Sequence, residues 1–341
     1  EQLEAGRAFA LVTLVADQGS TPRAAGAEML VRDDGSIAGS IGGGLIEHTM
    51  MTAAATALAE RRSRRERADL RGEDLASGEK MVCGGAADVL ITFVPPRDAE
   101  LLAVCRALKD ARDAGRRSWY VTASPPGDDA GSFARPVEHC LLAESGELAG
   151  AAVCEAAALR RLTAAAALHG TATLPDGRDV VLERVDPPAL AVVCGAGHVG
   201  CAVAPLLAGL GFRVVVLDDR EDLASAERFP GAEVVVRPFD GALAAVGVDE
   251  RAYVVIVTRG HVHDLDVLVQ ALRAGARYVG VMGSRAKRAR MLAALRAAGF
   301  DEGTIGRVHS PIGVAIGAET PAELAVSIAA ELVQARAGAG A

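Results

Sequence analysis

A glycine-rich turn in the second half of the chain carries the clearest chemical signal. The run Gly195-Ala196-Gly197-His198-Val199-Gly200 directly follows an apolar strand and opens a helix, and Asp218 ends the next strand. In a nucleotide site of the Rossmann type, such glycines let a pyrophosphate approach the helix N-terminus, and the acid accepts a hydrogen bond from a ribose hydroxyl. The pattern predicts a nucleotide site, or a vestigial one that serves protein contact, at Gly195, Gly197, His198, Gly200 and Asp218.

Two loops in the first half have the composition of anion sites. Gly42-Gly43-Gly44 opens a helix between Ser40 and Glu47, and consecutive backbone N–H groups in such a turn can point at a bound anion. A steric turn between strand and helix explains the same glycines. The loop Gly19-Ser20-Thr21-Pro22-Arg23 combines hydroxyls with a guanidinium, which suits an oxyanion, although a plain turn has the same composition. The candidate binding residues are therefore Ser20, Thr21, Arg23, Gly42, Gly43, Gly44 and Glu47.

One cysteine has a setting that favours reactivity. Cys83 stands before Gly84 and Gly85 in a predicted loop, where backbone donors and Lys80 would favour the thiolate, which is a soft metal ligand. A buried structural thiol is the alternative. The remaining cysteines fall in predicted helices or strands and are most simply core residues: Cys105, Cys140, Cys154, Cys194 and Cys201.

Two further loops follow apolar strands of the second half. Thr258-Arg259-Gly260-His261 follows one strand and Gly283-Ser284-Arg285 follows another. Loops at the carboxyl ends of parallel strands face the ligand crevice, so Arg259, His261, Ser284 and Arg285 are candidate cofactor-binding residues. The second of these loops, with Lys287 and Arg288, could hold a phosphate. His261 and His263 with nearby aspartates also fit a metal site, but the start of a helix explains them more simply.

The elements that must position the first-half residues form a mixed pattern. Apolar and alternating runs predict strands, and alanine-rich segments with helical spacing predict helices. The expected strands are 9–16, 28–32, 37–41, 87–94, 119–123 and a β-rich stretch at 137–148, and the expected helices are 45–62, 98–114 and 151–168. The basic run at 61–67 is expected to be the solvated C-terminal end of the first helix.

Strands and helices alternate regularly beyond Asp186-Pro187-Pro188, which is the best linker in the chain. Nearly unbroken Val/Ile strands separated by helices predict a parallel sheet covered on both faces. Thr320, Pro321 and Glu323 predict the start of the last helix. We therefore expect an α/β protein with a mixed α+β domain over 1–186, its core motifs at 9–94 and an extension at 95–186. A Rossmann-like, doubly wound parallel sheet is expected over 189–341.

Composition excludes several classes of protein. The 341 residues carry a net charge of −8 and 3% aromatic side chains, which argues against nucleic-acid binding by charge or by stacking. Six cysteines without a C-x-x-C pair, and no signal-like or membrane-spanning segment, indicate reduced thiols and a cytoplasmic protein. The sequence motifs of common hydrolases, kinases and zinc enzymes are absent.

In combination and order these motifs resemble the XdhC/CoxI family, accessory factors of xanthine dehydrogenase and related molybdenum hydroxylases. The resemblance covers nearly the whole chain except residues 100–185, and it includes two further stretches, Asp218-Asp219-Arg220 and Pro311 to Pro321. It implies an N-terminal XdhC/CoxI domain and a C-terminal Rossmann domain, and it adds Arg220 to the expected binding residues. Many relatives place a cysteine after the triple glycine, where this chain has Leu45, so a thiol contact from that turn is lost.

The resemblance implies that the protein binds molybdenum cofactor, as molybdopterin or a dinucleotide form. It would guard the cofactor while the terminal sulfur is installed and deliver it to an apo molybdenum hydroxylase of the xanthine dehydrogenase type, which is a chaperone role rather than turnover. Cys83 would be the thiolate near the molybdenum. A cysteine desulfurase is a candidate further partner, and a homodimer is the expected assembly. An NAD(P)-dependent oxidoreductase that uses the Rossmann crevice, with His261 or His263 as acid or base, is the competing prediction.

Overall fold

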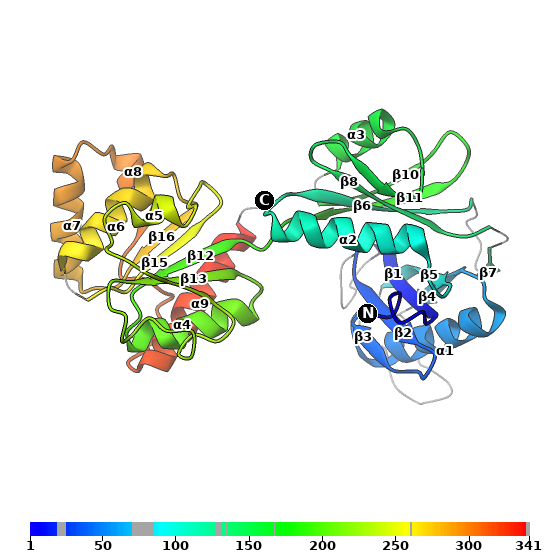
Figure 1. The fold of residues 1–341 in the computed structure, drawn as a ribbon, viewed down its shortest axis with the longest axis horizontal. Helices are drawn as coiled ribbons and strands as arrows, with labels where there is room; N and C mark the ends of the chain where they lie inside the picture. The colour runs from blue at the N-terminus through cyan, green and yellow to red at the C-terminus, as the bar shows by residue number, and fades with distance from the viewer. Residues whose placement is uncertain are drawn as a thin grey trace. The chain divides into compact units, whose positions relative to one another are not determined.

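The chain divides into two compact units, residues 1–187 and residues 188–341 (Figure 1). The computed structural model describes residues 1–18, 25–69, 85–126, 131–133, 135–166, 168–259 and 261–338. For residues 17, 18, 69, 261, 262 and 285 it describes the backbone alone. Each unit has hydrophobic cores of its own.

The first unit contains an antiparallel sheet with the strand order β3-β2-β1-β5-β4-β7. Its strands are β1 (Phe9–Gln18), β2 (Glu28–Arg32), β3 (Ile37–Gly39), β4 (Arg64–Asp69), β5 (Ala86–Val94) and β7 (Gly131–Ser132). Helix α1 (Gly44–Glu60) covers one face, where Ile46, Met50 and Ala54 pack against Val12 and Ile91. These helix residues are spaced by four, which places them on one side of the helix.

A second antiparallel sheet of this unit has the order β10-β11-β6-β8-β9. Its strands are β6 (Ser118–Ser124), β8 (Glu138–Ala143), β9 (Leu148–Gly150), β10 (His169–Thr173) and β11 (Asp179–Val185). Helix α3 (Ala156–Ala165) packs on one face through Leu159. Helix α2 (Ala99–Asp113) joins the two sheets, because Val104 shares a cluster with Phe9 of β1 and Leu141 of β8.

Strand β11 crosses the first sheet. On the side of β11 that faces this sheet, Asp179 pairs with Arg65 of β4 and Val181 packs with Val15 of β1. Glu183 approaches Gly26, which precedes β2. Because alternate residues of one strand meet β4, β1 and the segment before β2, the layer between the sheets is partly polar and partly apolar.

Two titratable groups in this layer respond oppositely to pH. Burial and then the Glu183 carboxylate raise the pKa of Glu28 from 4.5 to about 7, so the folded chain keeps a proton that the unfolded chain releases. Stability from Glu28 is therefore lost as pH rises from 4.5 to about 7. Burial lowers the pKa of His139 from 6.5 to about 4, so its contribution is lost as pH falls through that window.

Because the pH dependences of stability from Glu28 and His139 offset each other, a substitution of one residue is needed to separate them. We expect Glu28→Gln to gain stability relative to the wild type between about pH 5 and about pH 8, by up to about 3 kcal/mol. The single tryptophan, Trp119 of β6, reports urea unfolding of this unit. A stability difference that stays the same at both pH values would contradict a buried, protonated Glu28.

The second unit is a parallel sheet with the strand order β14-β13-β12-β15-β16-β17. Its strands are β12 (Leu190–Cys194), β13 (Arg213–Asp218), β14 (Glu233–Val236), β15 (Tyr253–Ile256), β16 (Tyr278–Val281) and β17 (Val308–His309). Its helices are α4 (His198–Gly209), α5 (Ala242–Ala245), α6 (His261–Arg273), α7 (Arg285–Ala297), α8 (Glu302–Gly306) and α9 (Pro321–Ala337). Val192 and Val193 pack into different clusters, so both faces of the sheet are covered. This order is that of a doubly wound Rossmann sheet, and the predicted fold class is confirmed.

The prediction that the basic run at 61–67 forms the C-terminal end of the first helix is wrong. Arg61 ends α1 with a φ of 54°, and Arg64–Asp69 form β4 beside β5. The charges suit a strand here because Arg65 meets Asp179 of the second sheet and Arg67 meets Asp88 of β5.

Other expectations need smaller corrections. Helix α3 begins at Ala156 rather than 151, because the extended chain before it hydrogen-bonds to the second sheet, where Ala151 N–H donates to the His139 carbonyl. The core prediction is right for the buried Cys140 and Cys194 and wrong for the exposed Cys105. Cys154 and Cys201 are half-buried and pack against the edges of core clusters.

The last helix begins as predicted, with Thr320 and Glu323 in a capping box. Within the described ranges, no helix has the length and apolar character needed to cross a membrane.

Candidate functional site

The glycine turn before α1 is closed by a side chain of its own helix. The Glu47 carboxylate accepts hydrogen bonds from the Ser40 hydroxyl at 2.6 Å and from the N–H groups of Ile41 and Gly43 at 3.0 and 2.9 Å. These bonds, the one from Ser40 first, hold the pKa of Glu47 below its usual range. All three glycines of the turn have positive φ, which explains their residue type. Two N–H groups of the predicted anion cradle are thus already engaged, because Gly43 donates to Glu47 and Gly42 donates to the Ser40 hydroxyl at 3.2 Å.

The described residues that flank the first-half motifs in the sequence lie at strand ends on one side of the first sheet. In the strand register, Gln18 of β1 and Asp69 of β4 both stand opposite Ala86, the first residue of β5. Gly39 ends β3 on the same side, and the Ser40 N–H donates to the carbonyl of Glu28 at the start of β2. The sequence predicted these motifs one by one, and the register brings their neighbouring strand ends together.

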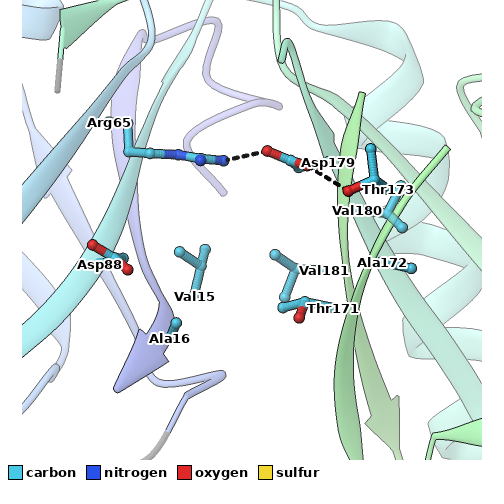
Figure 2. Close-up of a pocket in the computed structure, with 10 residues that line it drawn as sticks. All are labelled: Val15, Ala16, Arg65, Asp88, Thr171, Ala172, Thr173, Asp179, Val180 and Val181. Carbon is cyan, nitrogen blue, oxygen red and sulfur yellow. Dashed lines mark hydrogen bonds and ion pairs between the residues drawn. The ribbon is translucent and has the colours of Figure 1, made fainter. Parts of the chain in front are cut away.

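A cavity of about 310 Å³ lies beside these strand ends, between the two sheets (Figure 2). Its aliphatic surface comes from both sheets, with Val15 of β1 facing Val181 of β11 in Figure 2. Charged and hydroxyl groups occupy its edges. The full lining is Val15, Ala16, Arg65, Asp88, Thr171, Ala172, Thr173, Asp179, Val180 and Val181.

Arg65 reaches from β4 to the second sheet at one edge of the cavity (Figure 2). Its Nη2 donates to Asp179 Oδ2 and to Ser124 Oγ, both at 3.2 Å. The Thr173 hydroxyl donates to the other oxygen of Asp179 at 3.0 Å. Asp88 lines the cavity from β5, and its ion pair with the exposed Arg67 is long, at 3.9 Å. The cavity therefore offers hydrogen-bond donors and acceptors around an apolar centre.

Sequence reasoning did not single out the polar residues of this cavity. Arg65 fell within a run interpreted as a helix end. Asp88 interrupts the apolar run of β5 on the side that carries Leu90, which packs toward the second sheet. A charge inside an otherwise apolar strand was the one signal that pointed to the cavity.

Two glycines of the Rossmann turn are required by packing. A Cβ at Gly195 would lie 2.5 Å from the Val257 carbonyl oxygen, and one at Gly200 would lie 2.0 Å from the Gly195 carbonyl oxygen. Gly197 has open space around its Cβ position, and the exposed His198 begins α4. The turn thus combines close strand-to-helix packing with an accessible helix N-terminus.

Asp218 is buried at the end of β13, and its carboxylate is already engaged. The Ala196 N–H donates to Oδ2 at 2.7 Å, and the Arg220 guanidinium donates to both oxygens at 2.8 Å. Burial alone would raise the pKa of Asp218, but the bonds from Arg220 and Ala196 lower it to about 2. Full access of a ribose diol to this acceptor requires Arg220 to move, so the ribose contact stays a prediction.

The helices that follow the crevice loops, α6 after β15 and α7 after β16, share a buried ion pair. The Thr258 hydroxyl donates to Asp264 Oδ1 at 2.6 Å, and the Lys287 ammonium pairs with Oδ2 of the same carboxylate. Ser284 caps α7 by accepting the Lys287 N–H, and Arg259 is exposed. Ser284 thus has a structural role, and cofactor binding by Arg259 and Ser284 stays a prediction.

Several predicted site residues lie outside the described residues: Ser20, Thr21, Arg23, Cys83 and Gly84. The side chains of His261 and Arg285 also lie outside the description, whereas Gly85 is buried directly before β5. Within the described ranges, no three His, Cys, Asp or Glu side chains gather as a metal site would require.

The fold defines a class of α/β protein in which a unit of antiparallel sheets precedes a Rossmann unit. Residues 2–69 match the XdhC and CoxI family, and residues 191–332 match the XdhC Rossmann domain. The chain belongs to the XdhC and CoxI family, which confirms the resemblance seen in the motifs.

Relatives align along nearly the whole chain. An uncharacterized Escherichia coli protein, YqeB, is 28% identical over 96% of this chain, which spans only 43% of that relative. A probable xanthine dehydrogenase subunit of Bacillus subtilis is 25% identical, over 96% of this chain and 92% of its own. A crystal structure described as a xanthine dehydrogenase from Bacillus halodurans is 23% identical, covers 97% of this chain and 92% of its own, and has a TM-score of 0.80. At this identity the structural likeness establishes the fold alone.

Proposed function

We propose that this chain is an accessory factor that matures a molybdenum hydroxylase of the xanthine dehydrogenase type. It holds molybdenum cofactor, protects it during sulfuration and inserts it into the apoenzyme. Family membership and the name of the Bacillus subtilis relative support the maturation role. The observation that carries the cofactor part is the cavity beside the strand ends that flank the first-half motifs.

The cavity fits the ring of the cofactor by chemistry. Molybdenum cofactor is a pterin with a dithiolene and a phosphate. Aliphatic surfaces from Val15 and Val181 suit the faces of the ring, and Asp88 and Arg65 suit its polar edge. The turn at Gly42–Gly44 is a poor phosphate cradle because its Gly43 N–H donates to Glu47 and its Gly42 N–H donates to Ser40. We therefore assign the phosphate to Arg23 and the metal side to Cys83, both outside the described residues.

The bound cofactor supplies the molybdenum and sulfur chemistry that the hydroxylase later uses. The chain's own residues bind and orient it. Arg65 is fixed by Asp179 and Ser124, so it offers a positioned donor, and side chains of both sheets line the site of the ring. A thiolate at Cys83 would hold the soft metal side and limit its oxidation.

Metal and pterin analysis tests the proposal. We expect the full chain, purified from a host that makes the cofactor, to retain molybdenum and pterin together. Cys83→Ala is expected to lower the retained molybdenum several-fold, because one soft ligand is lost. The matched control is Cys105→Ala, which removes an exposed thiol on α2 and leaves retention unchanged.

The outcomes separate the parts of the proposal. A wild-type protein that holds neither molybdenum nor pterin overturns cofactor binding. Equal retention in Cys83→Ala overturns the thiolate role alone. Maturation is measured separately, as the gain in activity of an apo xanthine dehydrogenase mixed with the loaded protein. Nicotinamide turnover with alcohols or aldehydes would instead favour the competing oxidoreductase, whose ribose acceptor is engaged by Arg220.

A further inference from the structure

We infer that the cavity between the two sheets recognises a planar heterocycle through an amino-lactam edge, with Asp88 as the acceptor that selects the amino group. This edge is the 2-amino-4-oxopyrimidine unit, which presents an amino N–H, a ring N–H and a carbonyl oxygen in a row. The inference rests on the proposed function for the source of the ring, but the recognition chemistry is argued from the cavity itself.

The volume and the lining of the cavity favour a flat, compact ligand. Its volume of about 310 Å³ lies at the lower end of small-molecule sites, which suits one fused ring system rather than a whole dinucleotide. Val15 and Val181 approach it from opposite sheets, and Ala16 and Ala172 add small side chains to its lining (Figure 2). These aliphatic side chains give a ring in the cavity an apolar surface to contact without an aromatic platform.

Asp88 is the acceptor that would distinguish ligands with an amino group from ligands without one. It lies opposite Ala16 in the register of β1 and β5. It is two residues nearer the start of β5 than Leu90. Its side chain is 35% exposed, and its ion pair with the exposed Arg67 is long at 3.9 Å, so the carboxylate keeps acceptor capacity for a ligand. An ionised carboxylate only accepts hydrogen bonds, and it can take two parallel N–H bonds from one planar group. An amino group next to a ring N–H provides that pair of donors.

Arg65 and Thr171 supply the hydrogen-bond donors that the carbonyl oxygen of the ligand requires. Arg65 is held at 16% exposure by Asp179 and Ser124, so its guanidinium is positioned before a ligand arrives. Thr171 adds a hydroxyl from β10, the outer strand of the second sheet. A ligand carbonyl next to the ring N–H accepts from these donors, whereas a ring without the amino group leaves Asp88 without one of its donors.

Two free pteridines test the recognition in the full chain without metal. Pterin has the amino group, and lumazine carries a second carbonyl in its place. We expect wild-type protein to quench pterin fluorescence with a dissociation constant about tenfold to a hundredfold lower than that for lumazine, the range set by one hydrogen bond to a charged group. Asp88→Asn keeps the side-chain shape and is expected to lose most of this preference.

Two further variants keep the test decisive. Asp110→Asn changes an exposed carboxylate on α2, away from the cavity, and is expected to bind as the wild type does. Thr171→Phe places a ring at an exposed position on the cavity lining and is expected to weaken both pteridines. Circular dichroism of each variant establishes that it is folded.

The results distinguish this inference from the proposed function. No pterin binding at millimolar concentration, or an unchanged pterin preference in folded Asp88→Asn, overturns the cavity assignment. If the protein still retains molybdenum cofactor in that case, the proposed function stands and the ring binds elsewhere. Pterin binding with the expected preference supports the cavity even if the purified protein carries no molybdenum.

Discussion

Replacing Gly200 by alanine is expected to destabilise the second unit by about 3 kcal/mol or more. A Cβ at this position would lie 2.0 Å from the Gly195 carbonyl oxygen and 3.1 Å from its carbon. Both atoms belong to the backbone of the strand-to-helix turn, so relief requires α4 to move away from β12. In an ordinary helix position alanine is better than glycine by about 1 kcal/mol, so the sign of the change reports the close contact.

Chemical unfolding followed by far-ultraviolet circular dichroism measures this effect. Gly209→Ala is the matched control, because Gly209 ends the same helix and has no heavy atom within 4 Å of its Cβ position. We expect this control to be neutral or slightly stabilising. If Gly200→Ala were as stable as Gly209→Ala, α4 would not approach the turn as closely as described.

The second unit is predictable from sequence because its signals are local. Most of its apolar strands are followed closely by a helix, and the Gly195–Gly200 fingerprint fixes which strand begins the unit. Local sequence signals are not sufficient to predict the surroundings of Asp218. Its spacing from the glycines predicts a ribose acceptor, but the bidentate bond from Arg220 depends on how the chain turns after β13.

The cavity of the first unit could not be predicted in the same way. Its residues come from β1, β4 and β5 of one sheet and from β10 and β11 of another, and the crossing of β11 over the first sheet brings them together. Arg65 in particular follows a helix and stands in a basic run, so local pattern favoured a solvated helix end. The pairing of β4 with β5 and the ion pair of Arg65 with Asp179, far away in the sequence, favour a strand at this position.

The ion pair between Lys287 and Asp264 gives the second large prediction. Asp264 is 1% exposed and Lys287 is 14% exposed, so each charge depends on the other for compensation. We expect Lys287→Met to destabilise the second unit by about 3–5 kcal/mol, because it leaves a buried carboxylate with the Thr258 hydroxyl as its remaining described side-chain donor. Methionine fills much of the space of the lysine stem, so lost packing accounts for little of this change.

A second substitution separates charge from packing. Adding Asp264→Asn to Lys287→Met removes the uncompensated charge, so the double variant is expected to recover more than half of the lost stability. Lys109→Met is the control, since the Lys109 ammonium pairs with Asp113 on the exposed side of α2 and its loss should not be measurable. A double variant no more stable than Lys287→Met would mean that the lysine acts through its packing. In that case the hydrogen bond from Thr258, rather than the ion pair, would stabilise the buried Asp264 carboxylate.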